Sequence, residues 1–250
     1  MENGEMVLLR TFLKEKPREF IVCVSEDVFH SDFGIIELSE LFRLSPGDRI
    51  CSHKGQEFIV QKPRMPDMFR HAQRSGAPMM PKDIGMVVAY TGLCKNDVVL
   101  DAGTGSGVLS MYLGSIAKNV ITYEIKENFA NLARNNISKA GLHNVEVRCG
   151  NIVEEIDKIE EKFDVVTLDT INSPEVVPKV RRVLVPGGFV VTYSPFIEQT
   201  IAIRKALDAS GPWDVMTIEC IERPLSVSER GTRPGTGGVG HTGYITIARI

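Results

Sequence analysis

A seven-residue segment, Asp101-Ala102-Gly103-Thr104-Gly105-Ser106-Gly107, constrains the fold more than any other part of this sequence. It follows a short apolar run at 98–100 and precedes a helical pattern at 108–116. Glycines at a strand-to-helix turn let the backbone bend sharply and approach a ligand closely. In open parallel sheets such turns lie at the carboxyl ends of the strands, where ligands bind. The segment therefore predicts a ligand-binding loop in an α/β sheet.

Strand and helix patterns alternate beyond this loop. Further strands are expected at 120–123, 145–147, 163–168 and 189–193, and late strands at 213–222 and 243–248. A polar-faced helix is expected from Asn128 to Ala140, where Gly141 stops it. This βαβ spacing predicts an α/β fold with a doubly wound, mostly parallel sheet covered on both faces.

The N-terminal part has a different texture. Residues 6–60 show β-rich runs separated by turn signals and no long helical period. We expect a small β domain, a connector and a ligand-binding domain, over residues 1–62, 63–81 and 82–250. The connector carries a helix candidate with Arg70, His71 and Arg74, and the Gly-rich stretch 231–240 is expected to be a flexible loop.

The composition excludes several classes of protein. The 250 residues, 43% of them hydrophobic, are enough for a sizeable core. The net charge of −3 means that any nucleic-acid surface must be a local basic patch. No apolar run reaches the ~18 residues of a membrane helix, and Met1–Arg10 lacks the apolar core of a signal peptide. We therefore expect a cytoplasmic protein with no membrane partner.

The cysteines point to no special chemistry. There are five, widely spread, and no C-x-x-C pair occurs, so neither a zinc site nor a redox motif is indicated. We expect no metal and interpret the cysteines as small buried hydrophobes, with their disulfide state left open.

Polar side chains follow the strands after the loop. Glu124 ends the second strand about 17 residues beyond the loop, where a carboxylate can hold two ribose hydroxyls. Asn151 follows the third strand and can contact a purine amino group. These positions predict a nucleotide cofactor. The expected contacts are Met79, Asp101, Gly103, Gly105, Ser106, Gly107, Val108, Glu124, Asn151, Ile152 and Asp169.

The glycine spacing separates two cofactor classes. The dinucleotide fingerprint G-x-G-x-x-G, counted from Gly103, needs its third glycine where Val108 stands. The pattern D-x-G-x-G-x-G, with Pro186-Gly187-Gly188 before a later strand, instead resembles the class I methyltransferase family. That resemblance implies S-adenosyl-L-methionine as cofactor, with its methionine part held by the loop. A loop that only turns tightly is the alternative.

Segments outside the loop carry a more specific resemblance. They are His30-Ser31-Asp32-Phe33-Gly34-Ile35-Ile36, Gly55–Val60, Pro81-Lys82-Asp83-Ile84 and, after Arg233-Pro234, Gly240–Ile245 with Ala248-Arg249. Together they resemble the tRNA (adenine-N1)-methyltransferase family over nearly the whole chain. The resemblance implies methylation of N1 of a T-loop adenine, tRNA as partner, and usually a homotetramer.

Two positions depart from that family. Met80 stands where the family commonly has an aromatic residue or a histidine that could stack on the target base. The segment Asp169-Thr170-Ile171-Asn172-Ser173-Pro174 keeps the acid but lacks the common Pro-Trp pair. Both departures concern the grip on the base and leave the cofactor loop intact.

Asp169 is the candidate catalytic residue, because it ends a strand at the ligand-binding edge. A carboxylate hydrogen-bonded to the adenine N6 amino group would stabilise the positive charge that develops as N1 attacks the methyl group. The alternative is that Asp169 only binds the cofactor or caps a helix. His241 is a second candidate base, or it hydrogen-bonds a turn, and His30 and His71 are weaker candidates.

Two other functions stay open. A methyltransferase acting on damaged aspartate shares the catalytic fold but fits the N-terminal β region and the His241-Thr242-Gly243 ending poorly. A non-catalytic tRNA-binding subunit typically loses the cofactor loop, which is intact here. The arginines that can contact phosphates are Arg64, Arg70, Arg74, Arg223, Arg230 and Arg233.

Overall fold

The computed structural model describes residues 1–14, 16–74, 76–235, 237 and 240–250. The chain divides into two compact units: an N-terminal unit of Met1–Gln73 with Ser138–Gly141, and a second unit formed by the remaining residues from Arg74 to Ile250. The domain limits expected at residues 62 and 81 stay a prediction.

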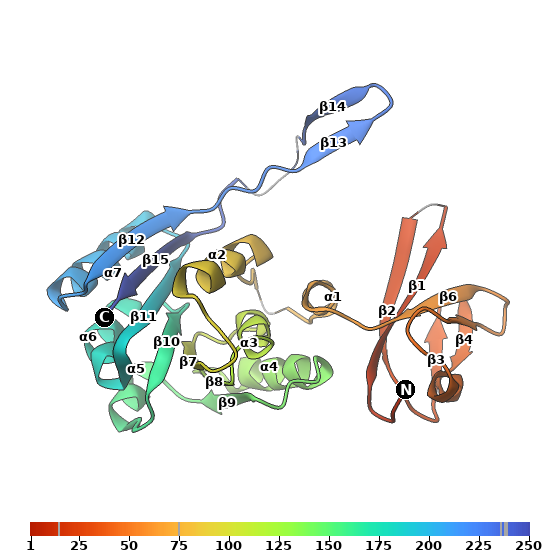
Figure 1. Ribbon diagram of the computed structural model, residues 1–250, viewed down its shortest axis with the longest axis horizontal. Helices are drawn as coiled ribbons and strands as arrows, with labels where there is room; N and C mark the ends of the chain where they lie inside the picture. Colours follow the sequence, from red (N-terminus) through yellow and green to blue (C-terminus); the bar gives the residue numbers. More distant parts are fainter. Residues whose placement is uncertain (15, 75, 236, 238–239) are drawn as a thin grey trace. The chain divides into compact units, whose positions relative to one another are not determined.

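The N-terminal unit is a small antiparallel β structure (Figure 1). Its four-stranded sheet has the order β2 (Lys16–Cys23), β1 (Met6–Leu13), β6 (Glu57–Gln61), β5 (Arg49–Cys51). A separate hairpin, β3 (Val28–Ser31) and β4 (Gly34–Glu37), is followed by the 3-10 helix η1 (Leu38–Arg43). A short helix, α1 (Met65–His71), ends the unit. Leu9, Ile36, Leu41 and Phe58 are fully buried, and each such side chain stabilises the fold by ~1.5–3 kcal/mol.

The second unit is built on a seven-stranded sheet, which confirms the predicted α/β fold. The strand order is β12 (Asp214–Glu219), β15 (Tyr244–Arg249), β11 (Leu184–Ser194), β10 (Phe163–Leu168), β7 (Val98–Ala102), β8 (Asn119–Glu124), β9 (Val145–Cys149). Neighbouring strands from β11 to β9 pair in parallel, and β15 is antiparallel to both β11 and β12. The carboxyl ends of β7, β8, β9, β10 and β11 therefore meet at one edge.

Helices lie on both faces of this sheet (Figure 1). One group is α2 (Pro81–Thr91), α3 (Val108–Gly114) and α4 (Glu127–Lys139), and the other is α5 (Ile152–Glu155), the short η2 (Ile156–Lys158), α6 (Ser173–Val183) and α7 (Ile197–Ala209). Pro81 occupies the first turn of α2, where its missing N–H costs nothing, and Gly92 ends that helix with a φ of 67°. The second group packs its apolar residues, such as Val180 and Leu207, against Val166 and Val190 of the sheet.

Two sequence expectations are wrong. The stretch expected as a flexible loop begins with β14 (Gly231–Pro234), which pairs with β13 (Leu225–Ser228) in a projecting hairpin, while residues 236, 238 and 239 lie outside the described residues (Figure 1). The five cysteines are not buried: four are exposed and Cys220 is half-buried, all as free thiols. Cys51 and Cys149 are the last residues of β5 and β9, and their side chains are exposed to solvent.

Candidate functional site

The Asp101 side chain lies near the end of β7, at the base of the glycine loop. Its fully buried carboxylate accepts hydrogen bonds from the hydroxyls of Ser110 (2.7 Å), Thr122 (2.7 Å) and Thr167 (2.6 Å). Burial raises the pKa of Asp101, although the three donors favour its charged form. Because the donors come from α3, β8 and β10, this carboxylate anchors the base of the loop to three elements.

Glycine is required at two positions of the loop. Gly103 has a φ of 91°, and a Cβ atom there would lie 1.9 Å from the carbonyl oxygen of Asp169. Gly107 has a φ of 79°, and its Cβ would lie 3.1 Å from the Cβ of Ala133 on α4. The first glycine therefore lets the β7 and β10 ends approach, and the second lets α3 start close to α4.

Glu124 ends β8 with its carboxylate held by the backbone. Oε2 accepts a hydrogen bond from the Gly105 N–H (2.9 Å), and Oε1 accepts one from the Lys126 N–H (3.0 Å). The residue is only 6% exposed. Two backbone donors fix the orientation of the carboxylate, and each oxygen keeps a further lone pair for a ligand hydroxyl.

A cavity of about 370 Å³ opens at this edge of the sheet, within the ~300–1,000 Å³ usual for small-molecule sites. A second hollow of about 80 Å³ adjoins it, sharing Gly103, Gly105 and Asp169 in its wall. The expected cofactor contacts that line one or both are Met79, Gly103, Gly105, Ser106, Val108, Glu124, Asn151, Ile152 and Asp169. Asp101 and Gly107 support the loop from outside these two walls. Sequence reasoning missed other wall residues, notably Tyr123, Phe129 and Ile171.

The Asn151 side chain already has two partners. Its Oδ1 accepts a hydrogen bond from the Val153 N–H (3.2 Å) at the start of α5, and its Nδ2 donates to the Glu154 carboxylate (3.1 Å). It is therefore the N-cap of that helix as well as part of the cavity wall. A contact from Asn151 to a purine would use the second lone pair of Oδ1 or its backbone.

Asp169 follows β10 and is half-buried in the cavity wall. Its backbone N–H donates to the Ala102 carbonyl (2.8 Å), which fixes the residue beside the glycine loop. Within the described part of the chain, no group donates a hydrogen bond to its carboxylate. Burial, and then the charge of Asp101, raise the pKa of Asp169 to about 7. A carboxyl group with this pKa is poised to accept a proton or a hydrogen bond near neutral pH.

A polar cluster around the buried Asp83 carboxylate joins three segments that are far apart in sequence. Lys82 Nζ donates to the Asp83 carboxylate (2.7 Å), to the Thr242 hydroxyl (2.7 Å) and to the Cys220 carbonyl (2.6 Å). Burial raises the pKa of Tyr193 to about 12. A hydrogen bond with Thr242 lowers this pKa, whereas the negative charges of Asp83 and Asp169 raise it further. Tyr193 therefore lies near both this cluster and Asp169. The segments 81–84 and 240–245 were both noted for their resemblance to the methyltransferase family. The sequence did not predict that they contact each other.

His241 has no free ring nitrogen. Nδ1 lies 2.5 Å from the Glu219 carboxylate and Nε2 lies 2.8 Å from the Pro195 carbonyl oxygen. Both partners are acceptors, so they favour the doubly protonated ring. The hydrogen bond to Glu219 and, to a lesser extent, the one to Pro195 raise the pKa of His241. This geometry supports the turn-stabilising alternative over a base.

The described residues were compared with the requirements of a metal site and of a membrane-spanning helix. They contain no cluster of three or more His, Cys, Asp or Glu side chains suited to a metal ion. None of their helices has the length and apolarity needed to cross a membrane.

Comparisons with known proteins show the family of the chain. Residues 76–233 match the family model of the tRNA methyltransferase complex GCD14 subunit. The chain is 34% identical, over 98% of its length and 96% of the relative's, to a tRNA (adenine(57)-N(1)/adenine(58)-N(1))-methyltransferase of Methanocaldococcus jannaschii. A tRNA (adenine(58)-N(1))-methyltransferase of Thermus thermophilus is 30% identical, with 94% and 93% of the two chains covered.

A solved structure extends the comparison to the fold. The crystal structure of a SAM-dependent O-methyltransferase from Thermotoga maritima superposes with a TM-score of 0.83 at 27% identity, and the match covers 100% of this chain and 94% of that one. The fold is therefore that of a known methyltransferase structure. The chain belongs to the GCD14 family of S-adenosylmethionine-dependent tRNA methyltransferases.

Proposed function

We propose that this chain transfers the methyl group of S-adenosylmethionine to N1 of an adenine in the T-loop of tRNA. The observation that carries the proposal is the Asp169 carboxylate, which stands in the cavity wall with a pKa of about 7 and accepts no hydrogen bond from the described residues. The whole-length likeness to enzymes named for adenine-N1 methylation of tRNA supports the substrate.

The cavity suits the cofactor. The oriented carboxylate of Glu124 would accept hydrogen bonds from the ribose hydroxyls, and the close backbone at Gly103 and Gly105 would admit the methionine part. The further contacts proposed are Met79, Ser106, Val108, Asn151, Ile152 and Asp169, with Asp101 and Gly107 holding the loop. The bound cofactor supplies an electrophilic methyl group.

Asp169 would act on the target base. The adenine N1 lone pair forms the new N–CH₃ bond as the S–CH₃ bond breaks, and positive charge spreads from N1 to N6. A carboxylate that accepts a hydrogen bond from the N6 amino group stabilises this charge and orients the ring. Since no donor among the described residues engages the carboxylate, both oxygens can make this contact.

The base has an apolar surface beside Asp169. Ile171 lies two residues further on, is 75% exposed and lines the cavity. Met80 is half-buried as the N-cap residue of α2, and its neighbour Met79 contributes to the wall of the smaller hollow. We propose that these aliphatic side chains replace the ring that the family commonly uses for stacking.

We propose further that the chain works as a homotetramer in the cytoplasm. Every residue of the β13–β14 hairpin is exposed, including Leu225 and Val227. A two-stranded hairpin is marginally stable alone, so a neighbouring subunit is the expected cover. Light scattering on the purified protein tests the assembly, and a monomer at working concentration contradicts it.

A methylation assay tests the reaction. Unmodified tRNA transcript is incubated with the protein and methyl-labelled cofactor, digested to nucleosides and mapped. We expect label in 1-methyladenosine of the T-loop, and none when the T-loop adenines are replaced by guanine. Label retained in that control contradicts the proposed target. Label on a peptide with damaged aspartate, and none on tRNA, favours the carboxyl methyltransferase alternative.

A further inference from the structure

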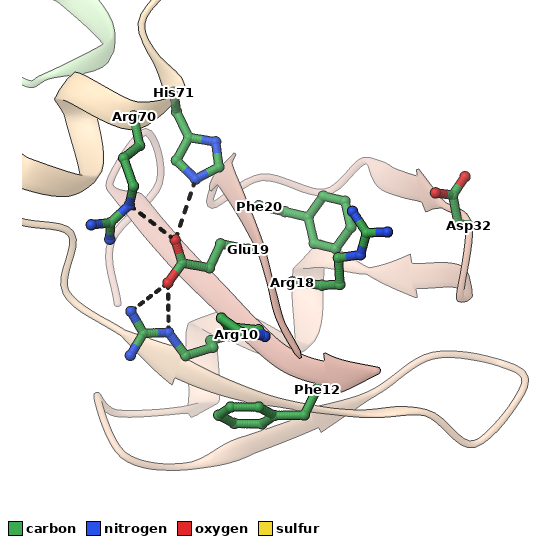
Figure 2. Close-up of a pocket in the computed structure, with 9 residues that line it drawn as sticks. Arg10, Phe12, Arg18, Glu19, Phe20, Asp32, Arg70 and His71 are labelled. Carbon is green, nitrogen blue, oxygen red and sulfur yellow. Dashed lines mark hydrogen bonds and ion pairs between the residues drawn. The ribbon is translucent and has the colours of Figure 1, made fainter. Parts of the chain in front are cut away.

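A second cavity, of about 700 Å³, lies in the N-terminal unit (Figure 2). It opens beside the β1–β2 hairpin and the end of α1, and none of its wall belongs to the site described above. We call it the hairpin cavity; the wall residues that matter are Arg10, Phe12, Arg18, Glu19, Arg70 and His71. These residues combine several cations with an exposed aromatic ring.

Glu19 organises the cationic side chains. Its carboxylate pairs with Arg10, with Arg70 Nε at 3.3 Å and with His71 Nε2 at 3.8 Å, as the dashed lines in Figure 2 show. Burial raises the pKa of Glu19, but the hydrogen bond from Arg10 and the nearby positive charges lower it by more. One carboxylate thus holds two guanidinium groups and an imidazole at one place. The arginine N–H groups not used by Glu19 or Asp67 remain available to an anion.

Arg18 adds a further cation to the wall. Among the described residues, no side chain or carbonyl pairs with its guanidinium, and no dashed line joins it to another wall residue in Figure 2. Residues 14–18 contain three basic side chains and one acidic one, and Lys14 and Lys16 are exposed at the hairpin tip. The hairpin therefore carries surplus positive charge in a chain that is acidic overall.

Phe12 provides an aromatic face in the same wall. Its side chain is 54% exposed, although burial of a phenyl ring would stabilise the fold. It lies two residues from Arg10 on β1 and so shares a face of the strand with it. An exposed ring next to guanidinium groups is the combination that binds a nucleic-acid strand, with a base stacked on the ring and phosphates on the cations.

We propose that the hairpin cavity binds an RNA strand of the substrate outside the methylated loop, and that this strand passes around the edge strand β2. An unpaired base would lie on Phe12 and a backbone phosphate on Arg10 of the same face, with another phosphate on Arg18, which the register places on the opposite face of the hairpin. This inference rests on the proposed function, since it takes the RNA to be tRNA. Charge complementarity favours RNA: the wall holds three arginines against the two acids Glu19 and Asp32, so the surplus is positive, and the ring suits a base of any sequence. The surface thus supplies the local basic patch that an acidic chain needs.

Two single variants test the surface, Phe12→Ala and Arg18→Ala. Both side chains are exposed, and neither has an internal hydrogen bond among the described residues, so we expect parental melting temperatures. Phe12→Ala should weaken tRNA binding by about 5- to 150-fold, the range for loss of one base–aromatic stack. Arg18→Ala should flatten the slope of log affinity against log salt by about 0.7 to 0.9, the value of one phosphate contact.

Matched controls lie elsewhere in the same unit. Val28→Ala removes an exposed apolar side chain, and Arg49→Ala removes an exposed arginine paired with Glu57. Both should keep parental tRNA affinity and salt slope. All four variants should keep cofactor affinity and the rate at saturating tRNA, because the change is in KM and not in kcat.

The outcomes separate this inference from the proposed function. If the parent protein does not methylate tRNA, the proposed function fails. If the parent does so and the Phe12 and Arg18 variants bind tRNA as the parent does, the hairpin cavity is not an RNA surface. If those variants instead dissociate the oligomer, the occupant is a second copy of the chain and the inference is overturned.

Discussion

The Thr242 hydroxyl donates a 2.8 Å hydrogen bond to the buried carboxylate of Asp83, a residue 159 positions earlier in the chain. Lys82 closes the cluster by donating to both of them. Asp83 belongs to the first turn of α2, which begins directly after Met79 and Met80. The contact therefore fixes the start of α2, and with it the wall of the smaller hollow, to the segment before β15.

Removing one member of this cluster should cost substantial stability. Lys82→Met leaves the Asp83 carboxylate buried with a single hydroxyl donor, so we expect the free energy of unfolding to fall by about 3–5 kcal/mol. Denaturant unfolding followed by circular dichroism measures it. Lys158→Met is the matched control, because Lys158 forms an exposed pair with Glu155 and should cost less than about 1 kcal/mol. Equal losses in the two variants would show that the Lys82 pair contributes no more than a surface pair.

Local patterns predicted the parts of the site that lie close together in sequence. The glycine loop and Glu124 sit at successive strand ends, so the parallel order of β7 and β8 is enough to bring them together. The Lys82–Asp83–Thr242 cluster joins segments about 160 residues apart, and nothing in either segment specifies its partner. Motif resemblance had marked both segments, but only the fold shows that they meet.

Solvent exposure was harder to predict than topology. The cysteines were expected to be buried because the thiol is a small hydrophobe, yet Cys51 and Cys149 end strands and face solvent. The stretch 231–240 was expected to be a flexible loop because it is rich in glycine, yet its first four residues, 231–234, pair with β13. In both cases strand register decided the outcome, and register depends on the partner strand and not on composition.

Cofactor binding should depend on the charge of Glu124. Glu124→Gln keeps an acceptor oxygen but loses charge-assisted hydrogen bonds to the ribose hydroxyls, and we expect affinity for S-adenosylmethionine to fall by about 1–3 kcal/mol. Calorimetry without tRNA measures it directly. Glu175→Gln, an exposed acid in the first turn of α6, is the control and should bind as the parent does. Parental affinity in the Glu124 variant would place the ribose elsewhere.

The rate of methyl transfer should rise with pH through the pKa of Asp169, about 7. The ionised carboxylate is the form that accepts the N6 hydrogen bond, so kcat/KM should climb between about pH 6 and 8 and then level. Asp169→Asn should remove this rise. A parental profile in the Asn variant would assign the titration to another group.

The titration of Asp169 should also affect the stability of the fold, which should fall with rising pH while the rate rises. The pKa of Asp169 is raised in the folded protein, so the folded state holds a proton that the unfolded state has released between about pH 4 and 7. The free energy of unfolding should therefore decrease as pH rises through this window. Asp169→Asn lacks that decrease, so its stability relative to the parent should be greater at pH 8 than at pH 5 in denaturant titrations.

Replacement of Asp169 also separates charge from positioning. Asp169→Ala should bind tRNA and keep the fold but lose about 10²-fold or more in single-turnover methyl transfer, since a positioned acceptor at the N6 amino group is gone. Asp169→Asn retains the shape and one acceptor oxygen. If stabilisation of the developing charge matters, it should be slow as well at saturating tRNA. A near-parental rate in the Asn variant would leave Asp169 as a positioning group. A near-parental rate in the Ala variant would contradict the catalytic assignment and direct attention to Met80 and the Ile171–Asn172 loop.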